Sequence, residues 1–112
     1  MRKIEQQIIN AIREKKTFKN GERDTIIWAC NTMMTVQLWH NTIVILDKDI
    51  LILSNHHYST QTTISRLNAV TAALNLPLTF RIKNGETILL HDGKVTEERA
   101  LKINGLKITV KI

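Results

Sequence analysis

The sequence has few of the residues that usually mark a disulfide framework or a phosphate loop. Cys30 is the single cysteine among 112 residues, so no internal disulfide can form, and this usage fits a reducing compartment. We interpret Cys30 as a small core residue beside a strand. The four glycines are far apart, which excludes a glycine-rich phosphate cradle. Trp28 and Trp39 are scattered, and we interpret both as core residues of strands rather than a stacking platform.

Long apolar runs are also missing. The longest one, residues 43–46, is far shorter than the roughly 18 apolar residues that a membrane span requires. Basic residues at positions 2–3 are followed by the polar stretch of residues 4–7, which does not resemble the apolar core of a signal peptide. We therefore expect no membrane association and a cytoplasmic protein.

Metal and catalytic patterns are absent from the sequence. The histidines, His40, His56, His57 and His91, do not stand at ligand spacing with cysteines or carboxylates. Asp47 and Asp49 flank an expected tight turn, where aspartate has a structural role. We therefore predict no catalytic residue, no metal and no cofactor, and we lean against an enzyme.

Positive charge is in excess, with 16 basic and 10 acidic residues and a net charge of +6. The excess lies at both ends of the chain, in residues 1–23 and 81–112. Such a surplus favours nucleic acid or acidic proteins as partners, and a solvated basic face is the alternative. The candidate basic surface consists of four residues near the N-terminus: Lys3, Arg13, Lys16 and Lys19.

Two segments have the period of amphipathic helices. In residues 3–16, isoleucines recur every fourth position, and the turn signal at residues 20–21 ends the element. In residues 62–75, Ile64 and Leu67 begin an apolar stripe, and Pro77 prevents the helix from continuing. We expect Thr62 or Thr63 to cap this second helix.

Short β-branched runs separated by about two residues are typical of an antiparallel meander. The sequence predicts tight turns at residues 40–41 and 47–48, and Asn84-Gly85 is the strongest hairpin signal. A short helix is predicted over residues 96–102. The expected strands span residues 25–29, 33–39, 42–46, 49–53, 78–82, 87–91 and 106–112.

These elements predict a single α+β domain over residues 1–112. Its antiparallel sheet should have about six to seven strands, with both helices packed on one face, in the order α-β-β-β-β-α-β-β-β. The strands at residues 42–46 and 49–53 are apolar on both faces. They should therefore be central, or their second face should meet another subunit, which makes a homodimer possible.

The segment from residue 56 to residue 66 concentrates polar side chains at the start of the second helix. A helix N-terminus offers unpaired N–H groups and partial positive charge, which suits a phosphate or carboxylate. Hydroxyls add donors, the arginine could add a fork, and the tyrosine could stack on a base. The alternative is structural, with threonines capping the helix and Arg66 paired with an acid. The candidate ligand-binding residues are His56, His57, Tyr58, Thr60, Thr62, Thr63, Ser65 and Arg66.

Three strings resemble a group of small proteins from marine bacteriophages, cyanophages among them. Residues 60–69, TQTTISRLNA, are similar to the group's T-x-T-T-x-S-R-L-N-A string, and residues 38–43 and 2–7 are similar to two others. Tyr58 stands where the group usually has tryptophan, His40 lacks a following glycine, and residues 94–112 have no counterpart. The resemblance implies a phage protein acting in the cytoplasm of an infected bacterium, and it transfers no catalytic residue.

Three functions agree with these observations. The favoured one is a small phage-encoded accessory protein, a non-enzymatic module that binds nucleic acid or a host protein. The second is a self-associating structural or assembly protein. The third is a small enzyme acting on phosphate esters, such as a nuclease, which would use His56, His57 or Tyr58 beside Arg66.

Overall fold

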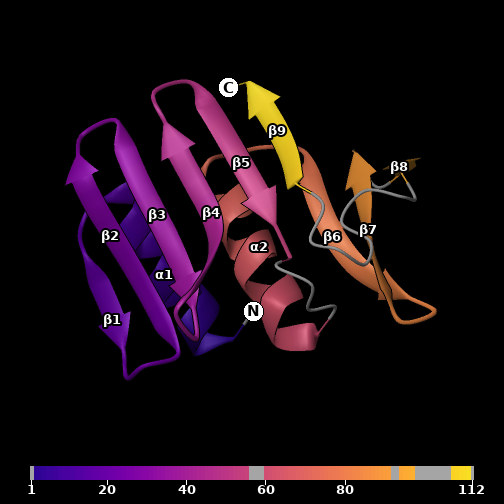
Figure 1. The fold of residues 1–112 in the computed structure, drawn as a ribbon, viewed down its shortest axis with the longest axis horizontal. Coiled ribbons are helices and arrows are strands. Elements are labelled where there is room, and N and C mark those ends of the chain that lie inside the picture. The colour runs from indigo at the N-terminus through magenta and orange to yellow at the C-terminus, as the bar shows by residue number, and fades with distance from the viewer. Residues whose placement is uncertain (1, 56–59, 92–93, 98–106, 112) are drawn as a thin grey trace.

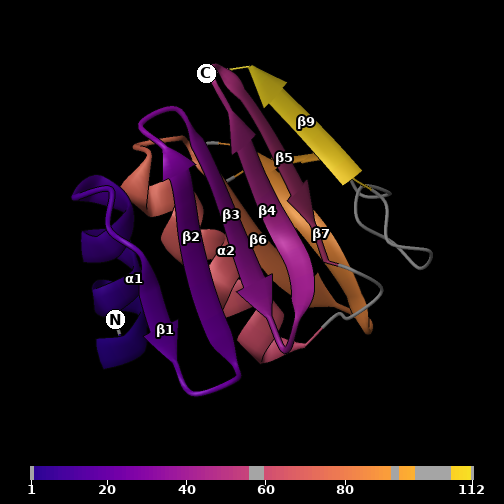
Figure 2. The same cartoon turned by 60° about the vertical axis from the view of Figure 1, so that its left-hand side comes forward.

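The computed structural model describes residues 2–55, 60–91, 94–97 and 107–111. It is an α+β structure in two layers, as predicted. A six-stranded antiparallel sheet forms one layer, and two helices lie against one of its faces (Figure 1). A second, three-stranded sheet lies on the helix side, as the rotated view shows (Figure 2).

The first helix, α1, spans Lys3–Arg13 and buries one apolar stripe, which includes Ile8 and Ile12. It ends three residues earlier than predicted. Lys15 adopts a positive φ of 54°, and the N–H of Lys16 donates to the carbonyl of Ala11 at 2.9 Å. This bond pattern closes the helix in the same way as a terminal glycine would.

The large sheet is a meander of five consecutive strands to which the last strand of the chain is added. The predicted strands are confirmed with shifted ends, whereas β1 was missed because it has only three residues. The strands are β1 (Phe18–Asn20), β2 (Asp24–Cys30), β3 (Met33–Leu38), β4 (Asn41–Asp47), β5 (Ile50–Ser54) and β9 (Lys107–Lys111), and they pair in that order.

The two-residue turns are each displaced by one position from the prediction. The β3–β4 turn uses Trp39 and His40, and the β4–β5 turn begins at Lys48; all three have a positive φ. The Asn84-Gly85 turn is confirmed, and both of its residues have a positive φ. It joins the two strands of a hairpin that is separate from the large sheet.

The second helix, α2, spans Gln61–Ala73 and runs parallel to α1. Ser65 bonds to Glu5 near the start of both helices, and Arg13 bonds to the carbonyl of Ala72 near their ends. Both helix N-termini therefore lie at the same end of the molecule. The predicted stop before Pro77 is confirmed, with Leu74 as the C-cap residue.

The remaining strands form their own sheet, so the prediction of one sheet was wrong in this detail. Strands β6 (Leu78–Lys83), β7 (Glu86–His91) and β8 (Lys94–Glu97) pair in that order. The side chain of Asn68 occupies the free edge of β6: it donates to the carbonyl of Phe80 at 2.9 Å and accepts from its N–H at 2.7 Å. Helix α2 thus takes the place of a further strand.

The helix predicted over residues 96–102 is contradicted at its start, because residues 96–97 belong to β8. Residues 98–102 lie outside the described part of the chain.

The hydrophobic core fills the space between the large sheet and the helices, with further contacts from β6 and β7. Its most buried members include Ile8, Ile26, Val36, Val44, Leu51, Leu53, Leu67 and Val70. Within the described ranges, no helix is long and apolar enough to cross a membrane.

Candidate nucleic-acid interface

The first turns of α2 contain a buried polar network. Arg66 is only 2% exposed, and its guanidinium binds the Asp24 carboxylate, with Nε 2.6 Å from Oδ1 and Nη2 3.3 Å from Oδ2. Its Nη1 donates to Ser65 Oγ at 2.9 Å, and that hydroxyl donates to Glu5 Oε2 at 2.8 Å. Arg23 adds a third bond to Asp24, at 2.9 Å. The network joins α1, α2 and β2.

The network also sets the ionisation of its two acids. Burial tends to raise the pKa of Asp24, but the hydrogen bonds from Arg66 and Arg23 outweigh it and leave that pKa below its ordinary value. The backbone N–H of Arg2 lowers the pKa of Glu5, and the hydroxyl of Ser65 adds to this effect. Both acids therefore stay charged at neutral pH. Ser65 and Arg66, two of the predicted ligand-binding residues, are engaged inside the protein, as the structural alternative expected.

Thr60 caps α2, two residues before Thr62 and three before Thr63, the two caps that the sequence predicted. Its Oγ1 accepts from the N–H of Thr63 at 3.2 Å and lies 3.0 Å from the hydroxyl of the same residue. The N–H groups of the first helical turn have no intrahelical acceptor. Among the described residues, none accepts from the N–H of Gln61 or Thr62. These two donors are therefore available at the start of the helix.

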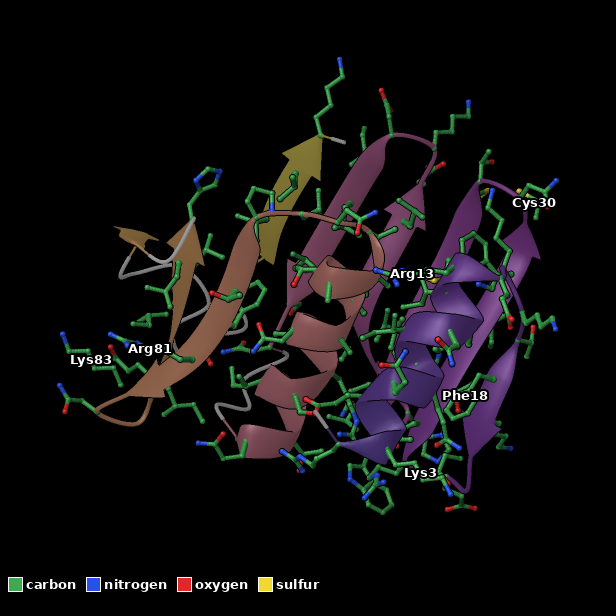
Figure 3. The ribbon with its side chains drawn as sticks, turned by 180° about the vertical axis from the view of Figure 1, so that it is seen from behind. Lys3, Arg13, Phe18, Cys30, Arg81 and Lys83 are labelled. Atoms are coloured by element: carbon green, nitrogen blue, oxygen red, sulfur yellow. The ribbon has the colours of Figure 1, made fainter. Side chains whose placement is uncertain are left out.

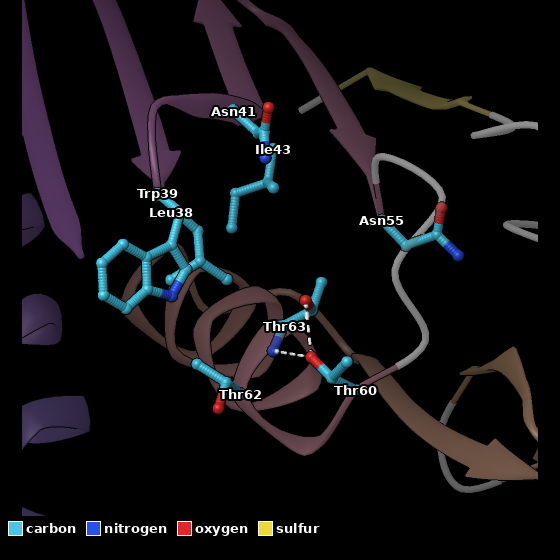
Figure 4. Close-up of a pocket in the computed structure, with 8 residues that line it drawn as sticks. All are labelled: Leu38, Trp39, Asn41, Ile43, Asn55, Thr60, Thr62 and Thr63. Carbon is cyan, nitrogen blue, oxygen red and sulfur yellow. Dashed lines mark hydrogen bonds between the residues drawn. The ribbon is translucent and has the colours of Figure 1, made fainter.

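A pocket of about 420 Å³ opens beside this helix start (Figure 4). It lies between the β3–β4 turn and the N-terminus of α2. Apolar side chains and amide or hydroxyl side chains line it together, a mixture typical of small-ligand sites. The lining residues are Leu38, Trp39, Asn41, Ile43, Asn55, Thr60, Thr62 and Thr63.

Trp39 is the most exposed large apolar side chain in the described part of the chain, at 59%. The prediction that it belongs to the core is therefore wrong. It occupies the first position of a two-residue turn with a φ of 51°, followed by His40 at 68°. Turns of this shape favour Asn-Gly, because a bulky side chain at positive φ is strained. The backbone N–H of Trp39 donates to the Arg23 carbonyl at 2.8 Å, which secures the turn.

The sequence contains a signal for this site that the prediction overlooked. A tryptophan and a histidine occupy a tight hairpin turn that lacks glycine. Neither core packing nor turn stability explains Trp39, since the side chain is exposed and the backbone is strained. Strained backbone of this kind concentrates at functional sites.

The four predicted basic residues do not form one patch. Lys3 and Arg13 are at opposite ends of α1 (Figure 3), about 15 Å apart at 1.5 Å per helical residue. Arg13 donates to carbonyls at the end of α2, and Lys16 pairs with Glu14 at 3.6 Å. Lys19 is exposed on β1. Lys3 is at the end where both helices begin, and Lys19 lies opposite Thr25, one residue from the Asp24 that bonds to Arg66, near the same end.

Three other predictions concern histidines, Tyr58 and Cys30. His56, His57 and Tyr58 lie outside the described residues. In the described segments, no group of three or more His, Cys, Asp or Glu residues is placed to hold a metal ion.

Cys30 is exposed, so its assignment to the core is wrong. A hydrogen bond with the Thr32 side chain lowers the pKa of its thiol.

Comparison with known proteins identifies a family for nearly the whole chain. The Kyanoviridae Gp96 protein family matches residues 1–107, a longer stretch than the resemblance seen in the sequence strings. No curated protein and no solved structure matches the chain. The match is to a phage family of the cyanophage type, as the resemblance implied. The chain therefore belongs to the Kyanoviridae Gp96 protein family.

Proposed function

We propose that this phage protein is a non-enzymatic module that binds single-stranded nucleic acid in the pocket between the β3–β4 turn and α2. The observation that carries the proposal is the exposed, strained Trp39 at the rim of that pocket. The indole offers a flat face to an unpaired base, and base–aromatic stacking tolerates any sequence. A duplex keeps its bases stacked on one another, so a single strand is the better ligand.

The α2 N-terminus supports the proposal as a place for a phosphate next to the stacked base. The N–H groups of Gln61 and Thr62 are available there, and the helix dipole adds partial positive charge. Helix α1 runs parallel to α2 and begins at the same end, where the charged Glu5 carboxylate offsets its partial positive charge. Lys3 is exposed at this end. The backbone carbonyl of Arg23 accepts a hydrogen bond from the N–H of Trp39, so Arg23 lies next to the β3–β4 turn.

The pocket has room for a base and has polar groups that could contact its edge. Its volume of about 420 Å³ falls within the range of small-ligand sites, roughly 300–1,000 Å³. Asn41 brings an amide with both donors and an acceptor, and Thr62 brings a hydroxyl. Leu38 and Ile43 provide an apolar wall. This mixture suits an uncharged heterocycle joined to a charged backbone.

Fluorescence anisotropy with labelled oligonucleotides tests the proposal. Single-stranded DNA, single-stranded RNA and duplex DNA of about 12 nucleotides would be titrated at low and at physiological salt, since electrostatic binding is strongest at low salt. We expect the single strands to bind more tightly than the duplex. The Trp39→Ala variant should bind roughly 5- to 150-fold more weakly, the range expected for loss of one stacked base. The Trp39→Phe variant should retain most of the affinity.

Lys83→Ala serves as the matched control, because Lys83 is an exposed cation on the separate β6–β7 hairpin (Figure 3). It should leave the affinity nearly unchanged. Trp28→Phe leaves Trp39 as the single tryptophan, whose emission should be quenched as the strand binds. Absence of binding to any single strand at low salt would overturn the proposal. Binding that Trp39→Ala does not weaken would move the site elsewhere, and a host protein retained through Trp39 alone would favour the protein-binding alternative.

A further inference from the structure

The outer face of the large sheet, on the side away from the helices, has a continuous uncharged row. The strand register aligns one residue from each of five neighbouring strands, and all five are β-branched. This outer row consists of Ile27, Thr35, Ile45, Ile52 and Thr109. No described element covers it, since both helices and the small sheet lie on the opposite face (Figure 2).

This face is more apolar than an uncovered antiparallel sheet needs to be. Four large apolar side chains are exposed in the described residues, and three of them lie here: Ile27 at 43%, Met33 at 42% and Ile50 at 43%. A shallow hollow of about 90 Å³ lies between Ile27, Met33 and Ile45, so this surface is not flat. A sheet with one solvated face normally alternates apolar and polar residues, so an apolar outer face indicates an interaction surface.

The charges around the outer row favour a second copy of this chain over a nucleic acid or a strongly acidic protein. The row that runs beside it aligns Asp47, Ile50 and Lys111, so its two charges are of opposite sign. The whole chain carries +6, so two copies repel one another at long range. A two-fold interface places the same patch on both partners, and the opposite charges of Asp47 and Lys111 limit the repulsion between two copies of this one.

Pairing through the sheet edges is less favourable than packing through the face. The edge strand β1 has only three residues and includes the exposed Lys19, and the opposite edge strand β9 includes the exposed Lys111. Short edges and edge lysines are features that oppose strand addition. Face-to-face packing of two sheets, by contrast, requires only interdigitated apolar side chains.

The available area sets the expected strength. Five strands about 4.8 Å apart, each roughly 20 Å long, present a projected area of about 400 Å² per copy. Stable complexes bury about 800 Å² per partner, so the contact lies at the weak end of specific interfaces. Two copies joined through this area should therefore separate on dilution.

We propose that this protein forms a two-fold homodimer in which the outer rows of two copies pack against each other, burying Ile27, Ile45 and Ile52. Each pocket beside Trp39 lies at the end of the sheet, outside the contact. The dimer would therefore carry two copies of that pocket. The proposal does not depend on what the pockets bind.

Sedimentation equilibrium between about 5 and 500 µM, a range chosen for a small interface, tests the proposal. We expect a monomer at the lower end and a growing dimer fraction toward the upper end. The double variant Ile27→Thr, Ile52→Thr keeps β-branched residues in both strands but removes apolar surface, so the fold should persist. It should raise the dissociation constant at least about tenfold. Circular dichroism checks that the variant is folded.

Trp39→Ala is the matched control, because among the described residues it removes the one exposed large apolar side chain that is not on this face. It should leave the dissociation constant unchanged. Amide NMR shifts of the wild type provide a second measurement. Dilution should move the signals of Ile27, Ile45 and Ile52 in the outer row and should not move those of α1. A monomer at every concentration would overturn the proposal, and so would a dimer that the double variant leaves intact. A monomer that captures only another protein through this face would overturn it as well.

Discussion

Arg66 Nε lies 2.6 Å from Asp24 Oδ1, and this contact links the middle of α2 to the first residue of β2. Both side chains are almost completely buried. A charge buried in this way is stable only with its partner, because desolvation would otherwise be uncompensated. The arginine that looked like a ligand fork in the sequence is thus part of the framework that supports the pocket.

Removing one member of this pair should destabilise the fold strongly. Arg66→Met leaves the Asp24 carboxylate buried with only Arg23 beside it, and we expect a loss of about 3 kcal/mol in the free energy of unfolding. Urea unfolding followed by circular dichroism measures the loss. Arg23→Ala is the control, because its side chain is 39% exposed, and it should cost less than about 1 kcal/mol. Equal losses for the two variants would contradict the assigned role of Arg66.

Acid should weaken the fold through Asp24. Its native pKa is lowered by the two guanidinium groups in spite of burial, so ionised Asp24 favours the native state. This contribution is complete above the ordinary aspartate pKa of about 3.9 and is lost as the pH falls through the lowered native pKa. Urea unfolding between pH 7 and pH 2.5 should therefore show a decline that steepens below about pH 4. Asp24→Asn should be less stable at pH 7 and should show a smaller decline; the same decline would contradict the assignment.

Relieving the β3–β4 turn should stabilise the protein while it weakens binding. Trp39→Asn with His40→Gly installs the residues that this turn shape favours, and we expect a gain of roughly 1–2 kcal/mol in the free energy of unfolding. Thermal unfolding measures the gain, and the oligonucleotide titration measures the accompanying loss of affinity. A variant that is both less stable and still able to bind would show that Trp39 serves the fold instead of a ligand.

The cap of α2 can be assigned by comparing two threonines. Thr60→Ala removes the oxygen that accepts from the Thr63 N–H, and we expect a cost of about 1 kcal/mol. Thr62→Ala, two residues later, removes no capping oxygen and should change stability by less than about 0.5 kcal/mol. Urea unfolding of both variants under the same conditions makes the comparison. A larger effect at Thr62 would mean that the helix begins at a different residue.

The secondary structure was predictable wherever one face of an element is buried. Ile8 and Ile12 recur at the helical period, and the alternation in residues 33–38 matches a strand with one inner face. Ends and turns were less predictable. Lys15 ends α1 in a conformation usually taken by glycine, and Trp39 and Lys48 occupy turns without glycine. Local preferences are weak at such positions, and tertiary contacts override them.

The candidate site was predictable only in part. The threonines at the start of α2 were identified, because hydroxyls at a helix N-terminus follow a local rule. Trp39 was missed, because its exposure depends on where the neighbouring turn ends. Arg66 was given a ligand role because its partner, Asp24, is 42 residues away in the sequence. A pairing over that distance has no local signature.

The amino-acid sequence by itself determined the class of the fold, the two helices, most of the strands and the excess of positive charge, because each follows from local periodicity or composition. The tertiary structure decided which strands pair, that Asn68 takes the place of a strand beside Phe80, that Arg66 is buried against Asp24, and that Trp39 faces the solvent above a pocket. These features arise from contacts between segments far apart in the chain, and the free energy of such contacts depends on the packing of the whole molecule.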